Sequence, residues 1–282
     1  MISLRIYGGL GNQLFQIGGA LLLARRHGIS RLYIDSSQIS NYETSHKYVL
    51  KEVLDYSRSA EELGVSIVFK KSFLTKLRLP KLLRFRSSFN PFVTDYNFRK
   101  ALNNSKSSKL FLDGYFQECL TQSDFDAILM MLSSIMKPIP RIESEKLRNF
   151  DTVLHIRGGD FISLNRNPKL TGGFYSESLD KFSDLKDIKH VLVVTDDRDY
   201  AESLLKQYRG RVQFTISSGD EVADFRAIAN IPNRILSPST FGLMASGLGV
   251  NLEHGSVLAW DYWHGEVART ILVPGETRTY QE

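Results

Sequence analysis

The feature that most constrains the fold is the regular alternation of short apolar strands with helices in the second half of the chain. Strands are predicted at residues 152–156, 190–194, 212–216, 234–236 and 271–273, and helices at residues 175–185, 200–208 and 221–229, with a helix of small residues that follows the segment 237–242 and ends near residue 247. The strand segments are rich in Val, Ile and Leu, as expected for strands covered on both faces. Because parallel neighbours need a crossover connection, usually a helix, these repeated units predict a parallel α/β sheet with helices on both faces.

The first half opens with a unit of the same kind. A strand, a Gly-rich turn, a helix and a second strand are predicted at residues 2–7, 8–13, 14–26 and 32–34. Gly28 is the expected stop of the helix, and Asp35 ends the strand that follows. This order is typical of the opening of a doubly wound sheet. Further strands are predicted at residues 65–69 and 109–116, and a further helix at 123–136.

The chain is long enough for two domains of ordinary size. It has 282 residues, and its 42% hydrophobic and 24% charged residues are those of a globular protein. Pro138 and Pro140 interrupt the chain and precede a charged segment, so we place a boundary near residues 137–150. The prediction is an N-terminal Rossmann-like domain, 1–140, and a C-terminal one, 150–282.

Composition limits the other classes of function. Cys119 is the single cysteine, which excludes an intrachain disulfide and predicts a reducing compartment. The six histidines lack the close helical spacing of metal ligands, so no metal site and no cofactor are expected. The chain starts with a strand pattern and no leader sequence, and the apolar run 17–24 is too short to span a bilayer. These features predict a cytoplasmic protein.

Positive charge is concentrated between Lys70 and Lys109, where eleven Lys or Arg residues accompany a single acid, Asp95. Basic and apolar residues alternate there, but no nucleic-acid recognition motif is present, so no nucleic acid is expected as partner. A peripheral contact with an anionic membrane, at the inner face of the plasma membrane, fits this pattern. A solvated loop region fits it as well.

Three loops carry the candidate chemistry, each at the carboxyl end of a strand in the second half. The loop 155–160 offers the cation Arg157 and the backbone amides of two glycines, and the loop 195–199 offers carboxylates. The loop 237–242 offers hydroxyls and a helix N-terminus. Ligands of open α/β sheets bind at this edge, so together the loops predict a site for a nucleoside diphosphate.

Each loop also has a simpler interpretation. The first can be a plain Gly-rich turn with a surface Arg–Asp pair, and Asp196, Asp197, Ser239 or Thr240 can serve only as helix caps. The D-x-D form of residues 197–199 is that of metal-dependent sugar transferases, but at a helix start we discount it.

The N-terminal glycines suggest a rival function. Gly9 and Gly11 resemble the start of a dinucleotide fingerprint, and Asp35 falls near the position of a ribose-binding acid. A nicotinamide-dependent oxidoreductase is therefore the alternative from another class, although position 14 is Leu where a third glycine belongs. The amides of Asn12 and Gln13 suit hydrogen bonding to a sugar instead.

Five sequence blocks resemble glycosyltransferase family 11, the bacterial α-1,2-fucosyltransferases. In chain order they are Gly8–Gln16, Leu112–Gln117, His155–Phe161, Asp196-Asp197 and Ser239-Thr240-Phe241. The third matches the family's H-x-R-R-G-D-[YF] block, except that Gly158 stands in place of its second arginine. This departure leaves open a different nucleotide sugar or linkage.

The resemblance implies a GT-B-like architecture, in which two Rossmann-like domains with parallel sheets face a cleft, and GDP-fucose as donor. The N-terminal domain then lies on the acceptor side, with Asn12 and Gln13 as acceptor contacts, and the C-terminal domain binds the nucleotide sugar. Arg157 holds the β-phosphate, with Asp160 orienting it or its own loop; these two are the predicted catalytic residues. The predicted donor contacts are His155, Gly159, Asp196, Asp197, Ser239, Thr240, Phe241, Gly9 and Gly11. Of these, the resemblance implies that His155 and either Asp196 or Asp197 approach the guanine.

Sugar transfer from a nucleoside diphosphate builds negative charge on the leaving phosphate. Without a metal, a fixed guanidinium and oriented amides must stabilise that charge. An acceptor hydroxyl then attacks the opposite face of the sugar, which inverts the anomeric centre. The sequence thus predicts a metal-independent inverting fucosyltransferase that acts on a galactose-ended, free or lipid-linked glycan of a surface polysaccharide or O-antigen. A non-catalytic glycan- or nucleotide-binding protein remains an alternative, and the catalytic base stays unassigned.

Overall fold

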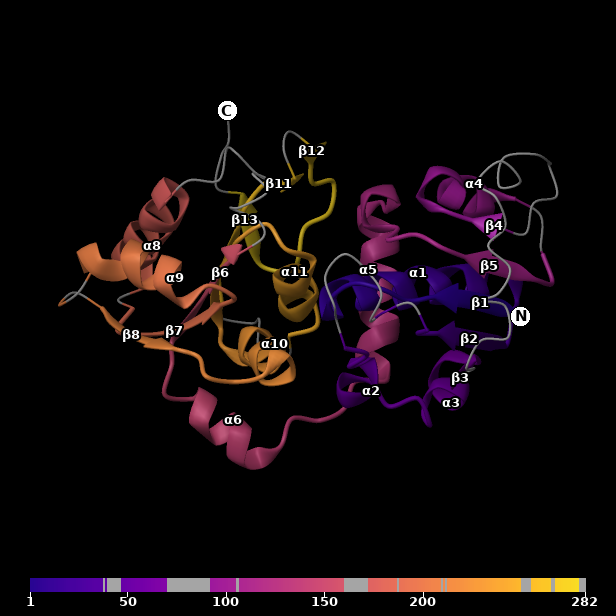
Figure 1. The fold of residues 1–282 in the computed structure, drawn as a ribbon, viewed down its shortest axis with the longest axis horizontal. Coiled ribbons are helices and arrows are strands. Elements are labelled where there is room, and N and C mark those ends of the chain that lie inside the picture. Colours follow the sequence, from indigo (N-terminus) through magenta and orange to yellow (C-terminus); the bar gives the residue numbers. More distant parts are fainter. Residues whose placement is uncertain are drawn as a thin grey trace. The chain divides into compact units, whose positions relative to one another are not determined.

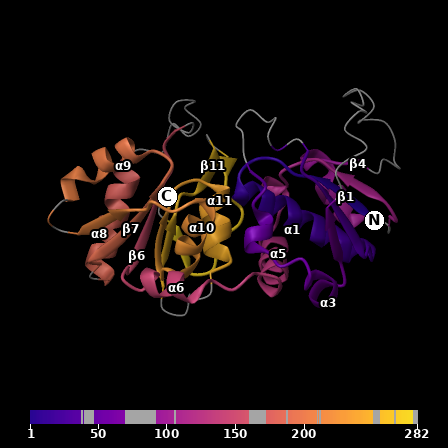
Figure 2. The same ribbon diagram turned by 60° about the horizontal axis from the view of Figure 1, so that its bottom comes forward.

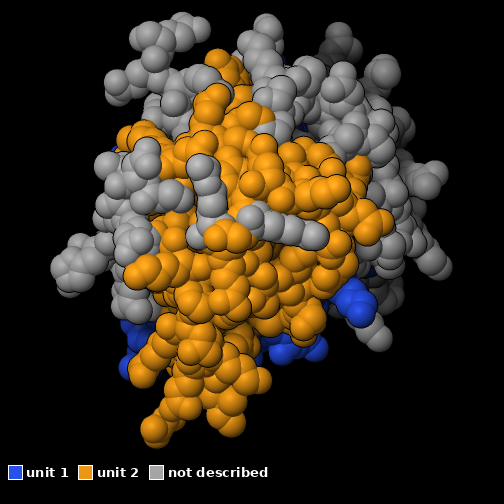
Figure 3. Space-filling view, turned by 90° about the vertical axis from the view of Figure 1, so that its left-hand side faces the viewer, with its two compact units in different colours: residues 1–137 blue, residues 138–282 orange. Residues whose placement is uncertain are grey.

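The computed structural model describes two compact units. They comprise Met1–Lys137 and Pro138–Glu282 (Figure 3), so the division falls at the first residue of the segment that we expected to hold a boundary. The described residues are 1–37, 39, 47–69, 92–104, 107–159, 172–186, 188–208, 210, 212–249, 255–264 and 267–278. The greater part of the basic segment and Asp160 lie outside them.

Unit 1 is built on a parallel five-stranded sheet in the order β3-β2-β1-β5-β4 (Figure 1). Its strands are β1 (Ile2–Arg5), β2 (Arg31–Asp35), β3 (Ser66–Phe69), β4 (Phe92–Val93) and β5 (Leu110–Leu112). Its helices are α1 (Leu10–His27), α2 (Leu50–Val53), α3 (Ser59–Leu63), α4 (Phe98–Asn103) and α5 (Gln122–Ser134). Figure 2 shows α1 and α5 side by side.

The predicted stop of α1 is confirmed. Gly28 adopts a left-handed conformation, φ 67°, and its N–H reaches the carbonyls of Ala24 and Arg25. Glycine also allows the close packing of α1 on α5, because a Cβ at Gly18 would lie 2.4 Å from Ile128. The helix begins at Leu10, earlier than predicted, directly after the Gly-rich turn.

Unit 2 is built on a parallel six-stranded sheet in the order β13-β10-β9-β6-β7-β8. Its strands are β6 (Thr152–Ile156), β7 (His190–Thr195), β8 (Gln213–Ile216), β9 (Asn233–Leu236), β10 (Val257–Ala259) and β13 (Glu276–Arg278), and β11 (Tyr262–His264) pairs with β12 (Val267–Ala268). Its helices are α6 (Arg141–Leu147), α8 (Gly172–Lys186), α9 (Arg198–Leu205), α10 (Glu221–Asn230) and α11 (Thr240–Gly247). The predicted α/β class with two Rossmann-like units is thereby confirmed.

The strand order of unit 2 fixes where a ligand can bind. From β6 the chain winds outward through β7 to β8, and it then returns to place β9 on the other side of β6. The winding direction therefore reverses between β6 and β9, so the loops after these two strands diverge to opposite faces of the sheet. In doubly wound sheets this topological switch point opens a crevice at the carboxyl edge.

Two elements of unit 2 differ from the prediction. Residues 271–273 are not a strand, because side chains satisfy their backbone: Arg269 donates to the Ile271 carbonyl, and Val273 donates to the Glu276 carboxylate. Arg269 and Glu276 form a buried ion pair there, and the sheet continues instead through β10 and β13. The charged boundary segment contains helix α6, which an Arg141–Glu145 pair supports at i,i+4 spacing.

No helix in the described ranges has the length and apolar character that crossing a membrane requires.

Candidate functional site at the carboxyl edge of unit 2

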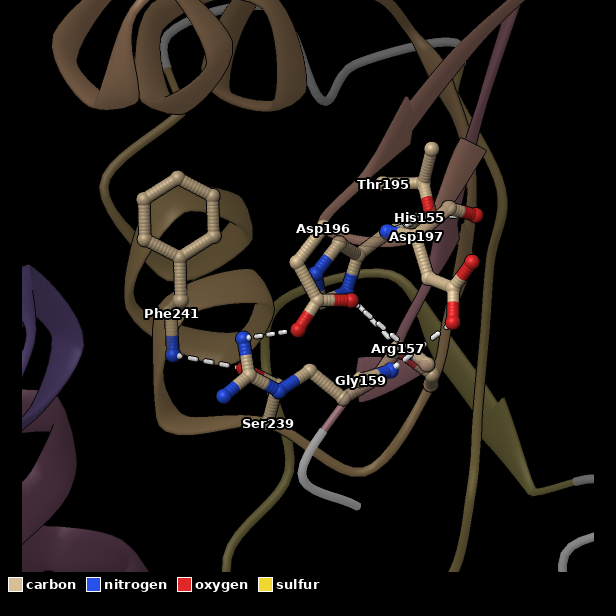
Figure 4. A network of polar contacts seen from close by, with 10 residues as sticks. His155, Arg157, Gly159, Thr195, Asp196, Asp197, Ser239 and Phe241 are labelled. Carbon is tan, nitrogen blue, oxygen red and sulfur yellow. Dashed lines mark hydrogen bonds and ion pairs between the residues drawn. The ribbon is translucent and has the colours of Figure 1, made fainter. Parts of the chain in front are cut away.

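The three loops predicted to carry the chemistry begin at neighbouring strands of the unit 2 sheet. The order β9-β6-β7 places His155 of β6 opposite Leu236 of β9 and Val194 of β7. The loops that follow begin at Arg157, Asp196 and Ser237, and the polar contacts between them are drawn in Figure 4. The candidate site therefore lies at the switch point of unit 2.

His155 is a buried, neutral member of this site. Only 4% of it is exposed, its Nδ1 lies 3.1 Å from the Ser237 hydroxyl, and its ring is tilted against Phe241. Burial, and secondarily the charge of Arg157, lower its pKa to about 3. The ring therefore stays uncharged at neutral pH, with one nitrogen as donor and the other as acceptor.

Arg157 is the cation of the site, and a carboxylate from the neighbouring loop orients it. Its Nη1 lies 2.7 Å from Asp196 Oδ2, and the two side chains are 31% and 32% exposed (Figure 4). The guanidinium is planar and holds its N–H donors in a fixed fork, a geometry that suits carboxylate and phosphate oxygens.

The glycine amides of this loop have partners other than the ones predicted. Gly158 donates to Asp196 Oδ1 at 2.8 Å, and Gly159 donates to Asp197 Oδ2 at 3.3 Å. The prediction that these amides face a phosphate is thereby corrected, because protein carboxylates already occupy them. Their role in this geometry is to hold the loop after β6 against the loop after β7.

Asp197 has two functions in the structure. Its other oxygen accepts from the Tyr200 N–H and caps α9, as the simpler interpretation expected. The Thr195 hydroxyl donates to the Asp197 carbonyl and accepts from the Asp197 N–H. Asp197 is therefore fixed from several directions, whereas its neighbour Asp196 is held by Arg157 and Gly158.

The loop after β9 places a helix N-terminus at the same edge. Ser239 caps α11 by accepting from the Phe241 N–H at 3.2 Å, and Thr240 is the first residue of the helix. A helix N-terminus favours negative charge. Phe241 packs edge-on against Phe225 and near His155, which gives the site an aromatic wall.

In unit 1 the predicted sugar contact of Gln13 is corrected. The side chain is fully buried, and its amide donates to the carbonyls of Gly8 and Lys47, both at 2.9 Å. Its oxygen accepts from Val49. Gln13 therefore ties the turn after β1 to a later loop and presents nothing to a ligand.

The other predicted residues of unit 1 lie in the turn between β1 and α1. Gly9 is the extended residue before α1, Gly11 is buried within the helix, and Asn12 is half-buried beneath Gly8, whose φ is 79°. The turn lies at the carboxyl end of β1, next to the loop that follows β5.

A residue after β4, which sequence reasoning did not single out, supports that neighbouring loop. Asp95 accepts from the N–H groups of Tyr115 and Phe116, and Phe116 adopts φ 65°, which is strained for a non-glycine residue. These two hydrogen bonds to Asp95, together called the Asp95 cradle, hold the loop in which the Tyr115 ring packs edge-on against the Tyr7 ring, with the ring centroids 4.8 Å apart. The Gly114-Tyr115-Phe116 sequence within the second family block was the available signal.

Two residues beneath the unit 2 site were also not predicted. Ser237 contacts His155 through its hydroxyl, and its N–H donates to the His155 carbonyl. Tyr175 of α8 is buried, and this burial raises its pKa, so the hydroxyl stays protonated. The polar run after β9 pointed toward Ser237, but no sequence signal marked Tyr175.

Within the described ranges, no three His, Cys, Asp or Glu side chains cluster in a way that could hold a metal ion.

Two solved structures of fucosyltransferases are similar in fold to this chain. NodZ from Bradyrhizobium is 15% identical with a TM-score of 0.54 over 88% of this chain and 92% of its own. POFUT1 in complex with GDP is 12% identical with a TM-score of 0.51 over 92% and 97%. The fold class of the chain is therefore α/β and GT-B-like.

Sequence comparison then defines the family. The model of Glycosyl transferase family 11 matches residues 92–257, more than half of the chain. The O-antigen biosynthesis glycosyltransferase WbnK from Escherichia coli is 26% identical over 265 residues, which cover 83% of this chain and 85% of that protein. The chain belongs to glycosyl transferase family 11 and is a glycosyltransferase.

Proposed function

We propose that this glycosyltransferase moves fucose from GDP-fucose to a hydroxyl, the 2-OH of a terminal galactose, on a glycan of a surface polysaccharide or O-antigen. The observation that carries the proposal is Arg157, a partly exposed guanidinium at the switch point of unit 2, in the loop after β6, whose neighbouring strand β9 leads into α11. The GDP and GDP-fucose in the POFUT1 structures, and the O-antigen pathway of WbnK, support the choice of donor and acceptor class.

Arg157 and the α11 N-terminus act on the leaving group. As the bond from the anomeric carbon to the diphosphate breaks, charge grows on the phosphate oxygens, and the guanidinium and the helix amides stabilise it. Buried His155 stays neutral and contributes hydrogen bonds to the nucleoside portion rather than a charge. In this scheme the protein's cation serves where a metal serves in other transferases.

The acceptor binds at the carboxyl edge of unit 1 in this proposal. Tyr115, held by the Asp95 cradle and packed on Tyr7, offers an aromatic edge and a hydroxyl, which suit a sugar ring. Asn12 remains a proposed acceptor contact, and Gln13 does not. Attack of the acceptor hydroxyl on the face opposite the diphosphate inverts the anomeric centre.

A panel of nucleotide sugars tests the donor. We expect transfer with GDP-fucose and none with UDP-sugars, unchanged by a metal chelator; transfer from another donor alone, or loss with the chelator, contradicts the proposal. NAD in a parallel binding titration tests the oxidoreductase alternative, and we expect no binding.

Membrane contact is a separate part of the proposal. The basic residues between Lys70 and Lys109 motivate an acceptor linked to lipid, met at the cytoplasmic face of the membrane. Flotation with anionic liposomes at low salt should carry the protein upward, and neutral liposomes serve as control. Absence of binding at low salt refutes this part alone.

A further inference from the structure

Asp196 and Asp197 interlock with the loop after β6. Each carboxylate accepts a different amide of that loop: Gly158 donates to Asp196 at 2.8 Å, and Gly159 donates to Asp197 at 3.3 Å. A Cβ at Gly158 would lie only 2.5 Å from the Cβ of Asp197. The two loops are therefore in direct contact, and a glycine at position 158 permits that contact.

Asp196 also forms an ion pair with Arg157, one of two cations in the described residues of the three loops; the other, Arg198, pairs with Glu202 on α9. Its Oδ2 lies 2.7 Å from Arg157, while its Oδ1 takes the Gly158 N–H. Each oxygen of this carboxylate thus already accepts from the loop after β6. A diphosphate that binds Arg157 competes with Asp196 for the same guanidinium.

The two aspartates differ in how firmly they are held. Asp197 caps α9 and exchanges two hydrogen bonds with Thr195, so its position follows from the helix. Asp196 precedes the helix cap, and its side chain is 32% exposed. An ion pair with this exposure is worth little net free energy, because water and salt screen both partners. It can therefore direct the guanidinium and still yield it to a doubly charged phosphate.

We propose that Asp196 is a positioning residue that occupies the place of the diphosphate before the nucleotide binds. Its carboxylate holds the Arg157 guanidinium at the switch point until the β-phosphate of the nucleotide displaces the carboxylate. The proposal rests on the function proposed above, because it takes a nucleoside diphosphate as the ligand. It differs from the role that the family resemblance implied, in which Asp196 or Asp197 contacts the guanine base. The two roles make opposite predictions for removal of the charge.

Calorimetric binding of GDP and GMP to the Asp196→Asn variant separates the roles. Asparagine keeps an oxygen for the Gly158 N–H but removes the charge that competes for Arg157. We expect GDP to bind about threefold more tightly than to the unsubstituted protein, because the screened ion pair no longer competes for Arg157. GMP lacks the β-phosphate, so we expect its affinity to be unchanged. Asp199→Asn is the matched control, since it removes the same charge from the exposed first turn of α9.

Weaker binding of both nucleotides to Asp196→Asn overturns the proposal and indicates that the carboxylate contacts the guanine base. Unchanged or weaker binding of GDP alone also overturns it, as does an equal gain in the Asp199→Asn control. A melting temperature within about 2 °C of the unsubstituted protein shows that the interlock still folds. Failure of the unsubstituted protein to bind GDP contradicts the proposed donor instead, and the comparison is then made with the diphosphate of the donor that the panel identifies.

Discussion

Replacement of Gly158 tests the interlock most sharply, because the family block that this chain resembles carries an arginine there. The built Cβ lies 2.5 Å from Asp197 Cβ and 3.1 Å from its Cγ and Oδ2. Carbon atoms prefer about 3.5–4.0 Å, so a methyl group overlaps Asp197 by roughly 1 Å. Asp197 cannot retreat without loss of the α9 cap and of the Gly159 hydrogen bond.

The cost follows from these contacts. Overpacking of this kind costs about 1–3 kcal/mol, and each hydrogen bond to a carboxylate that breaks adds roughly 1.5 kcal/mol or more. We expect Gly158→Ala to lower the free energy of unfolding of unit 2 by about 2 kcal/mol, which is a fall in melting temperature of roughly 5 °C. Because Arg157 is the adjacent residue, we also expect kcat to fall at least about tenfold.

Calorimetric melting and a transfer assay measure both effects, and a second substitution supplies the control. Asp197→Gly removes the clashing Cβ, so in the double variant Gly158→Ala should cost at least about 1 kcal/mol less than in the parent. Gly158→Arg should lose activity rather than gain a second phosphate contact. Parent-like melting and turnover of Gly158→Ala, or higher activity of Gly158→Arg, would refute the steric reasoning.

The remaining predictions concern two titrating groups and the acceptor side. Burial holds the pKa of His155 near 3, so its ring should show no titration by NMR between pH 5 and 8; a transition near pH 6.5 would contradict its buried setting. Burial raises the pKa of Asp224 to about 6, partly offset by the Ser217 hydroxyl, so the folded state favours the protonated form. The contribution of the protonated Asp224 to folding stability is present below about pH 4 and is lost as pH rises through 6. Asp224→Asn should therefore raise the free energy of unfolding by about 1 kcal/mol at pH 7 and give no such pH-dependent gain at pH 4. Equal gains at the two pH values would refute this. Tyr115→Ala should raise the acceptor KM about tenfold or more and leave GDP affinity unchanged, whereas Tyr115→Phe should recover most of the loss, and weaker GDP binding would remove Tyr115 from the acceptor side.

The sequence predicted the parallel sheets well because buried strands leave an unambiguous apolar signal. The strand at Thr152–Ile156 has the predicted bounds, and α11 ends at Gly247 as predicted. Residues 271–273 have the same apolar character but do not form a strand, because Arg269 and Glu276 claim their backbone groups. That outcome depends on side-chain contacts across the fold, which periodicity does not encode.

The site was predicted in its loops but not in its pairings. His155, Arg157 and Asp196 could be chosen because each is a polar residue at the end of a buried strand. That Asp196 pairs with Arg157, and that the glycine amides serve Asp196 and Asp197, follows from the register of β6 on β7. Gln13 was misassigned because its partners include Lys47, from a loop whose return to the turn no local pattern reveals.

The central claim is that Arg157, at the switch point of unit 2, stabilises the leaving diphosphate. Steady-state transfer from GDP-fucose by Arg157→Ala, with Arg157→Lys as the charge-conserving control, tests it most directly. We predict that kcat falls about 10²- to 10³-fold in the alanine variant, with partial recovery in the lysine variant and an unchanged melting temperature. Turnover of Arg157→Ala within twofold of the unsubstituted protein would contradict it.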